Sequence, residues 1–139
     1  AEASIDVLLD AMRSNRKALV AVNLGLTDAE AAGFWPVYDR YQKELNAVGD
    51  RWVALIEDYI ASYPSLSNEK AAKLLEDYLT VEADRLQVRR SYVPEFGAIL
   101  PGRKLARLYQ IENKMDAVMR YDLAARIPVV EQASSAPAQ

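Results

Sequence analysis

The sequence predicts an all-α protein, an elongated antiparallel helical hairpin with about four helices, and two observations carry this prediction. First, apolar and aromatic residues recur at steps of three or four from Phe34 to Tyr59, as on one face of an α-helix. Second, this stripe follows Leu26-Thr27-Asp28-Ala29-Glu30, where Thr27 and Glu30 can each bond a backbone amide of the first turn. A helix of roughly 35 residues extends about 50 Å, so it must pair with equally long helices, with another copy of itself or with a client.

The first two helices are predicted from this periodicity and from the residues that interrupt it. The first helix covers about Ser4 to Val22 and stops at Gly25, because glycine readily adopts the backbone conformation that ends a helix. The second, long central helix runs from Thr27 to about Ser62. Pro36 lies inside it, and its missing amide and its ring predict a kink near this position.

The last two helices follow a tight connection that ends at Ser67. This serine is the predicted cap of a third helix that extends to about Tyr92 and forms an antiparallel hairpin with the second. The chain then turns over Tyr92–Ala98, and Pro101, in a first helical turn, opens a fourth helix that ends near Ile127. The apolar seam predicted for this fourth helix consists of Leu105, Leu108, Ile111, Met115, Val118, Met119 and Leu123.

Composition favours one domain without a catalytic or metal centre. The chain has 139 residues; residues 1–132 form the predicted helical domain, and residues 133–139 are small and polar enough for a flexible tail. It contains no cysteine and no histidine, which excludes thiol nucleophiles, Ser-His-Asp triads and zinc sites built from these residues. We therefore expect no catalytic residue, no metal and no cofactor.

Charge and hydropathy narrow the range of partners. A net charge of −3 argues against nucleic acid, because phosphate groups require a cationic surface. No apolar run approaches the roughly 18 to 20 residues of a membrane span. Opposite charges four residues apart are expected on solvated helix faces, and the pairs are Arg40 with Glu44, Glu69 with Lys73, and Asp116 with Arg120.

One stretch of the chain is strongly basic. Between Arg85 and Arg107, six basic residues stand against Glu95 alone. If the third and fourth helices are antiparallel, this charge gathers around their shared turn. It could form a docking surface for an acidic protein, an unfolded client or an anionic membrane surface. The structural alternative is that these residues stabilise a helix end or pair with carboxylates of the first two helices.

Two short segments resemble the motifs of a known family. Leu26-Thr27-Asp28-Ala29-Glu30 resembles the Leu-Thr-x-x-Gln motif of the periplasmic Spy/CpxP family, with Glu in place of the final Gln. Residues 96–105 resemble a degenerate second copy, in which Pro101 replaces Thr, Lys104 replaces Gln and Leu100 is retained. A helical hairpin of the expected length lies between the two copies.

The resemblance implies a fold, a compartment and a mode of action. It implies a small exported protein of the periplasm, its signal peptide removed, built on a long hairpin and forming a homodimer with a cradle-like surface. Spy-like members are ATP-independent chaperones, and CpxP-like members restrain envelope-stress sensor kinases. The metal-sensing branch fits least, because its sites resemble histidine- and methionine-containing ones. This chain has no histidine, and its methionines are Met12, Met115 and Met119.

The resulting functional hypothesis is stress-related, noncatalytic binding of polypeptide. The client is an unfolded or amphipathic polypeptide, or the partner is an envelope sensor domain. Basic side chains would draw the client in, and the candidates are Arg85, Arg89, Arg103 and Arg107. Trp35 and Leu100 would hold its apolar groups.

Two alternatives remain open at this point. One is a purely structural dimeric helical module, whose apolar seam is consumed by a second copy. The other is a small helical enzyme of the chorismate mutase type, which binds two carboxylates with Arg and Lys and needs no metal. The residues of suitable type for that enzyme are Arg13, Arg16, Lys17, Arg89, Arg103 and Glu112.

Overall fold

The described residues form an all-α bundle without strands. The structure is a computed structural model that describes the backbone of residues 5–132 and the side chains of residues 13–132, so the predicted tail at 133–139 lies outside the described residues. The long helices are α1 (Ile5–Leu24), α2 (Asp28–Ser62), α3 (Asn68–Ser91) and α5 (Gly102–Ala124). A 3-10 turn, η1 (Tyr63–Ser65), follows α2, and a short helix, α4 (Val93–Gly97), precedes α5.

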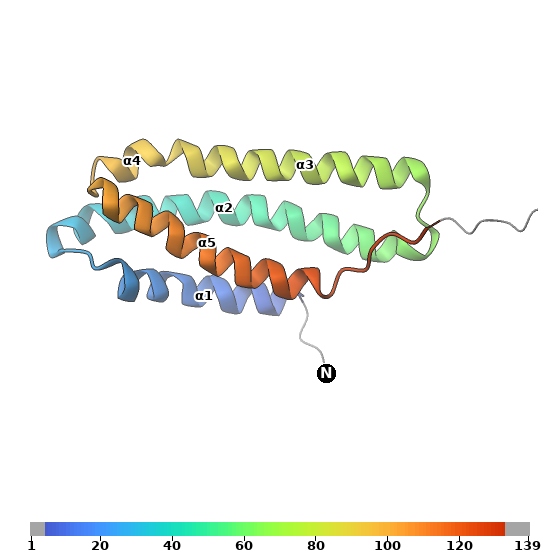
Figure 1. The fold of residues 1–139 in the computed structure, drawn as a ribbon, viewed down its shortest axis with the longest axis horizontal. Coiled ribbons are helices and arrows are strands. Elements are labelled where there is room, and N and C mark those ends of the chain that lie inside the picture. Colours follow the sequence, from blue (N-terminus) through green and yellow to red (C-terminus); the bar gives the residue numbers. More distant parts are fainter. Residues whose placement is uncertain (1–4, 133–139) are drawn as a thin grey trace, which may run out of the picture.

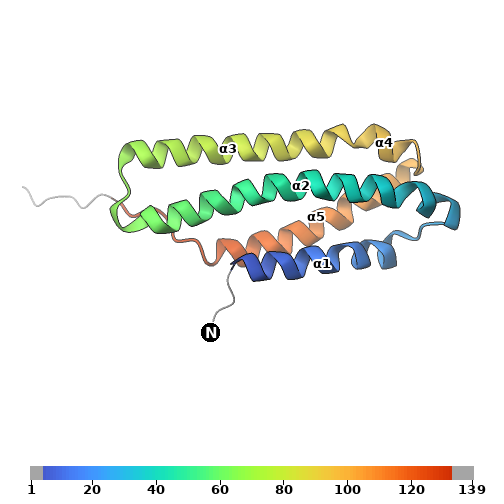
Figure 2. The same cartoon turned by 180° about the vertical axis from the view of Figure 1, so that it is seen from behind.

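The four long helices lie side by side and antiparallel, as the sequence predicts. In Figure 1, α3 lies alongside α2, and α1 lies against α5 below them. Figure 2 shows the same two pairs from behind, with α4 at the end of the bundle where α1 leads into α2. The bundle therefore has one end built around α4 and an opposite end built around the turn between α2 and α3.

The predicted helix starts are confirmed in atomic detail. The Thr27 amide donates to Glu30 Oε1 at 2.9 Å, and the Glu30 amide donates to Thr27 Oγ1 at 3.1 Å, which together make the capping box of α2. Ser67 Oγ accepts from the Lys70 amide at 3.1 Å and caps α3. Gly25 directly follows α1 and has a φ of 68°, the left-handed conformation that favours glycine.

The long central helix also carries the predicted proline. Pro36 lies inside α2, and one of the long helices is bent by 24°. A proline at this position removes the amide that would bond to the Ala32 carbonyl, which explains a bend without ending the helix. The prediction of a kinked long helix is therefore confirmed.

The connection into the last helix differs from the prediction in three ways. The expected turn over Tyr92–Ala98 contains a helix, α4, which places Phe96 in the core. Pro101 is extended, with φ −63° and ψ 154°, and precedes the first helical residue instead of lying in the first turn. The helix α5 ends at Ala124, three residues before the expected end at Ile127. An extended proline is compatible with a helix start, since it needs no amide partner.

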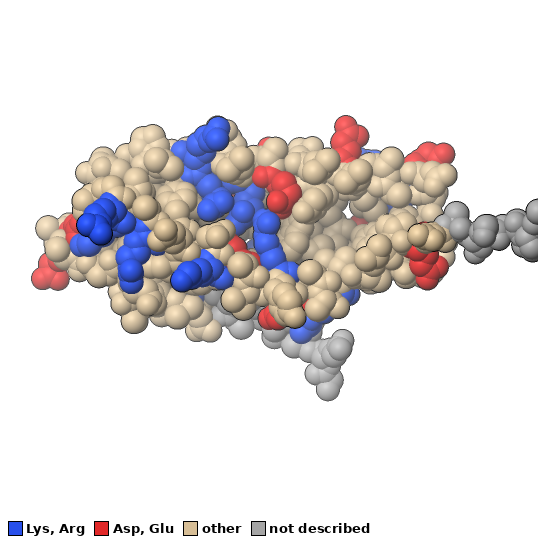
Figure 3. Space-filling view, in the orientation of Figure 1, with Lys and Arg blue, Asp and Glu red and all other residues tan. Residues whose placement is uncertain are grey.

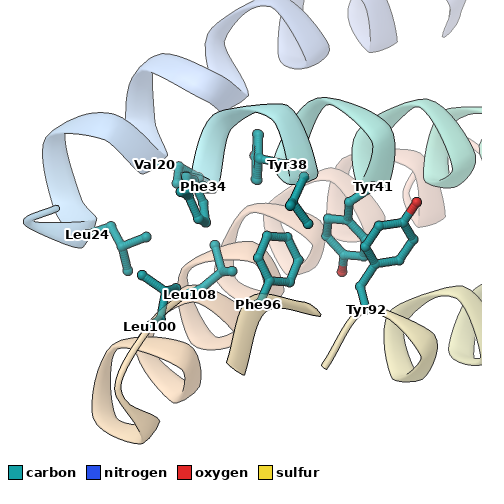
Figure 4. Packing of buried hydrophobic residues seen from close by; sticks show 10 residues of the cluster. Val20, Leu24, Phe34, Tyr38, Tyr41, Tyr92, Phe96, Leu100 and Leu108 are labelled. Carbon is teal, nitrogen blue, oxygen red and sulfur yellow. The ribbon is translucent and has the colours of Figure 1, made fainter. Parts of the chain in front are cut away.

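The main core lies at the α4 end of the bundle. It is built from aromatic rings in contact: Phe34 with Phe96 at 5.5 Å between centroids, and Tyr41 with Phe96 at 5.4 Å. Figure 4 shows these rings between α2, α4 and α5. Phe34 and Tyr38 are both buried. The buried members of this core are Val20, Leu24, Phe34, Val37, Tyr38, Tyr41, Tyr92, Phe96, Leu100 and Leu108.

The opposite half of the bundle is much less filled. Its buried cluster consists of Val53 and Leu123, with Trp52 and Met119 packed against them. The helix α3, all of which is described, buries Val81 alone. The apolar faces of α2, α3 and α5 therefore diverge from a shared core as they approach the turn between α2 and α3.

Candidate functional site

A buried ionic cluster joins three helices in the middle of the bundle. Glu112 and Asp116 lie one turn apart on α5 and are 1% and 5% exposed. Arg16 of α1 bridges them, since its Nε donates to Glu112 Oε2 at 2.7 Å and its guanidinium also donates to Asp116 Oδ1 at 2.9 Å. Arg85 of α3 bonds the second oxygen of Asp116. Two buried carboxylates are thus matched by two guanidinium groups.

Neutral side chains complete the hydrogen bonding of Glu112. The Tyr38 hydroxyl donates to Glu112 Oε1 at 2.6 Å, and Gln42 Nε2 donates to Glu112 Oε2 at 3.2 Å. Burial, and then the Glu112 carboxylate, raise the pKa of Tyr38 above its ordinary value. Burial alone would lower the pKa of Arg16, but Glu112 and Asp116 outweigh it and hold that pKa above its ordinary value. The cluster is a fully bonded structural core, with no free charge offered to a ligand.

This cluster overturns part of the sequence interpretation. Asp116 was expected on a solvated face with Arg120, but it is buried, and Arg120 bonds Glu82 of α3 instead. Val118, expected in the apolar seam, is 61% exposed. The rest of the predicted seam does pack inward: Leu108 and Leu123 are buried, and Leu105, Ile111, Met115 and Met119 pack against the core clusters. The inward face of α5 is wider than predicted, because it also contains Glu112 and Asp116. Two carboxylates at seam positions were the signal in the sequence, since acidic residues are rarely buried unless they are paired.

The other two predicted surface pairs also find different partners. Arg40 bonds Glu95 of α4 at 2.7 Å, and Lys73 bonds Asp77 at 3.1 Å. Spacing by four residues brings two side chains near each other, but a second carboxylate can compete for the same cation. For Arg40 this is Glu95 of α4, and for Lys73 it is Asp77, four residues further along the same helix.

The predicted basic residues lie near one another in sequence but do not form one free cationic surface. Arg85 is turned inward to Asp116, and burial lowers its pKa. Arg89 packs over the Tyr109 ring at 5.8 Å, and Arg107 Nε donates to the Asn23 carbonyl at 2.7 Å. Arg103 is exposed. Figure 3 shows Lys and Arg side chains over the α4 end and the middle of this face, away from the opposite end.

The two predicted apolar client contacts fare differently. Leu100 is 3% exposed and belongs to the main core, so it is unavailable to hold a client. Trp35 is partly buried, with its ring edge-on to Phe34 at 4.9 Å and Lys17 Nζ at 5.2 Å from its centroid. Both residues are withdrawn from solvent for the same reason: they pack in or against the aromatic core at the α4 end.

The two motif-like segments meet in space. Lys104 of the second segment bonds the Glu30 carboxylate of the first. The bond from Lys104, and the one from the Thr27 amide, lower the pKa of Glu30. Leu26 packs against the core that contains Leu100. These segments therefore join the start of α2 to the start of α5, which is a structural role.

An open apolar groove occupies the other end of the bundle. It encloses about 460 Å³ between α2, α3 and the segment that follows α5. Figure 3 shows this hollow in the half of the molecule opposite the basic end. Its walls are Trp52, Leu55, Ile56, Tyr59, Leu66, Ala71, Leu74, Leu75, Tyr78, Ala124, Ile127 and Val130, with Glu82 and Arg120 at one edge. The sequence does not predict this groove, because apolar periodicity identifies amphipathic helices but does not show where their apolar faces separate.

The outer wall of the groove is also an exposed apolar surface. Leu75 and Tyr78 of α3 line the groove and are 58% and 40% exposed, and Leu79 beside them is 56% exposed. Isolated apolar residues are common on protein surfaces, but a contiguous apolar surface beside a cavity is typical of a binding site. This groove is the candidate functional site.

Three of the five cations proposed for a helical enzyme are ion-paired within the chain, whereas Arg89 packs over the Tyr109 ring and Arg103 is exposed. Arg16 is saturated by Glu112 and Asp116, Arg13 bonds Asp50, and Lys17 bonds Asp39. Arg13, Arg16, Arg85 and Arg120 do border a small cavity of about 90 Å³, but each is ion-paired within the chain. Among the described residues no group of three or more acidic side chains is placed to hold a metal ion.

Comparison with known proteins leaves the fold class as the established result. No known protein family, curated protein or solved structure matches the chain. In the part of the chain that the structure describes, no helix is both long enough and apolar enough to cross a membrane. The chain is thus an antiparallel all-α bundle with an apolar groove, and its resemblance to the Spy/CpxP family stays a hypothesis.

Proposed function

We propose that this chain is a noncatalytic, chaperone-like or adaptor protein that holds amphipathic or partly unfolded polypeptide in its apolar groove, without ATP. The observation that carries the proposal is the groove itself, since about 460 Å³ of open volume is bordered almost entirely by apolar side chains. Burying apolar surface of a partner there is favourable at roughly 25 cal/mol per Å² before the costs of association.

The charge distribution supports attraction of the polypeptide to the molecule before it binds in the groove. The exposed Arg103, with the basic residues around it, attracts acidic polypeptide to the molecule from a distance of about 8 to 10 Å, the screening length at physiological salt. Contact with the groove then holds the apolar groups. Arg85 and Leu100 have no part in this mechanism, because Arg85 bonds the buried Asp116 and Leu100 lies in the core. The side chains that line the groove bind the apolar groups of the client in place of Leu100 and Trp35.

The compartment and the oligomeric state rest on the family resemblance alone. On that basis we propose an exported, periplasmic homodimer that acts in the envelope stress response, on unfolded clients or on one sensor domain. A purely structural dimer is the competing possibility, because the exposed surface at Leu75, Tyr78 and Leu79 could be covered by a second copy. The enzyme alternative is less favoured, because three of its candidate cations, Arg13, Arg16 and Lys17, are ion-paired within the chain.

The test is suppression of aggregation of a chemically unfolded protein without ATP, with sedimentation velocity in the same buffer. Near-stoichiometric protection supports the proposal, and Leu75→Glu, which places a charge in the groove, should abolish it. The matched control is Leu86→Glu, on the same helix and 52% exposed but outside the groove lining, which should retain protection. Absence of protection by a stable dimer would favour a dedicated partner or a structural role.

A further inference from the structure

The segment that follows α5 lies across the apolar groove. Beyond Ala124 the chain leaves the helix, and residues 128–132 form neither helix nor strand. In Figure 1 this segment, drawn in red, runs from the end of α5 toward the turn between α2 and α3. Ile127 and Val130 line the groove, whereas Val129 between them is 86% exposed. The segment therefore presents two aliphatic side chains, three residues apart, to the groove.

Two tyrosine hydroxyls bind the polar groups of this segment. Tyr59 donates to the Pro128 carbonyl at 2.6 Å, and Tyr63 donates to Glu131 Oε1 at 3.3 Å. The two rings, one at the end of α2 and one in η1, pack edge-on to each other at 5.8 Å between centroids. The groove and the two tyrosines thus contact a backbone carbonyl, an acidic side chain and two aliphatic side chains of a segment whose last residues form neither helix nor strand.

The segment covers the groove incompletely. Proline has no amide to donate, and the hydrogen bonds described here come from side chains and not from a paired strand. With the segment in place, about 460 Å³ stays open beside Leu74, Leu75 and Tyr78 of α3. The segment after α5 therefore occupies one wall of the groove and leaves room beside it, where a second polypeptide could bind and displace it.

We propose that residues 127–131 are a built-in competitor for the groove, and that the partner is an extended polypeptide segment of the same chemistry. Such a segment carries two aliphatic residues three apart, a free carbonyl between them and an acidic residue directly after the second. The partner displaces residues 127–131 and places its own aliphatic groups in the groove. This inference rests on the proposed function, because it names the ligand and the regulation of the same site.

The experiment removes the competitor without altering the groove walls on α2 and α3. The double variant Ile127→Asp/Val130→Asp places two charges where the segment enters the groove, and the matched control Val129→Asp places a charge on the neighbouring exposed residue. The probe is a synthetic peptide with the sequence of residues 125–132, and calorimetry measures its affinity. Tryptophan fluorescence is a second measurement of binding. In a Trp35→Phe background Trp52, which lines the groove, is the sole tryptophan of the chain.

We expect the double variant to bind the peptide at least about tenfold more tightly than Val129→Asp or the unaltered chain, because a groove occupied nine-tenths of the time loses tenfold in apparent affinity. Leu75→Glu should abolish binding in every background. Equal affinities for all three chains, with aggregation suppression intact, would overturn the competitor while leaving the proposed function standing. No peptide binding and no suppression would overturn both.

A second pair of variants covers the case in which the two aspartates disturb folding. Truncation after Arg126 removes the competitor, and truncation after Gln132 keeps it. The first should bind the peptide more tightly than the second by the same factor, with unchanged helical circular dichroism. If both truncated chains fold and bind the peptide with equal affinity, the proposal that residues 127–131 compete for the groove is wrong.

Discussion

Arg16 of α1 and Glu112 of α5 lie 96 residues apart in the sequence and bond to each other inside the bundle. The bond joins the first and the last long helix, and Asp116 and Arg85 extend it to α3. A buried carboxylate is tolerated only when its partners replace the water it has lost. The alignment of α1 with the rest of the bundle therefore depends on charge matching as well as on apolar packing.

Replacing Arg16 should damage the fold far more than replacing its neighbour on the same helix. Arg16→Met leaves Glu112 and Asp116 buried without their shared cation, and the free energy of unfolding should fall by about 3 to 5 kcal/mol. Arg13→Met breaks the exposed pair with Asp50 and should cost below about 1 kcal/mol. Urea denaturation measures both. Equal losses would mean that the buried cluster contributes no more than a surface ion pair.

The capping box of α2 should contribute measurably to stability. Thr27→Ala removes the hydroxyl that accepts from the Glu30 amide and should lower the free energy of unfolding by about 1 kcal/mol. Thr80→Ala is the control, because the Thr80 hydroxyl bonds the Glu76 carbonyl within an already formed helix. Thermal unfolding of the two variants should separate them, and a loss at Thr80 as large as at Thr27 would contradict the assignment.

The short helix α4 should act as an anchor of the main core. Phe96 is fully buried against Phe34 and Tyr41, so Phe96→Ala should cost about 3 to 5 kcal/mol, as lost burial and an unfilled cavity. Val93→Ala, in the same helix and 41% exposed, should change stability by about 0.5 kcal/mol or less. Chemical denaturation of both variants gives the comparison. A small effect of Phe96→Ala would mean that α4 is only a turn.

Alkaline pH should destabilise the bundle through its buried tyrosines. Burial raises the pKa of Tyr38, and burial together with Glu44 raises the pKa of Tyr92 to about 12. A raised folded-state pKa means that the unfolded chain loses its proton first, near pH 10, so stability is present below that pH and declines above it. Tyr38→Phe should flatten this decline, measured by urea unfolding between pH 8 and 11. It should also cost about 1 to 3 kcal/mol at neutral pH, because Glu112 loses a donor.

Acid should act on the bond that joins the two motif-like segments. Lys104, then the Thr27 amide, lower the pKa of Glu30 below its ordinary 4.5. A lowered folded-state pKa contributes stability above the unfolded value, and this contribution disappears as the pH falls below 4.5 through the folded one. Glu30→Gln should therefore be less stable than the unaltered chain at pH 7, and the difference should shrink below pH 4. A difference independent of pH would exclude ionisation of Glu30 as its cause.

Local interactions made much of this fold predictable. The caps at Thr27 and Ser67 and the bend expected from Pro36 depend on residues within one helical turn. The four long helices and their antiparallel order follow from apolar periodicity and short connections. The helix α4 escaped prediction because a five-residue helix carries no periodic signal, and its stability comes from the burial of Phe96.

The sequence by itself determined the class of the protein: helical, without the side chains that thiol or histidine chemistry requires, and basic in one stretch of the chain. Tertiary structure alone decided that Asp116 is buried, that Leu100 belongs to the core, that Arg85 faces inward, and that an apolar groove opens at the opposite end. The physical reason is the range of the interactions. A helix needs partners within four residues, whereas burial and ion pairing depend on which helix faces meet, and those faces come from residues as far apart as Arg16 and Glu112.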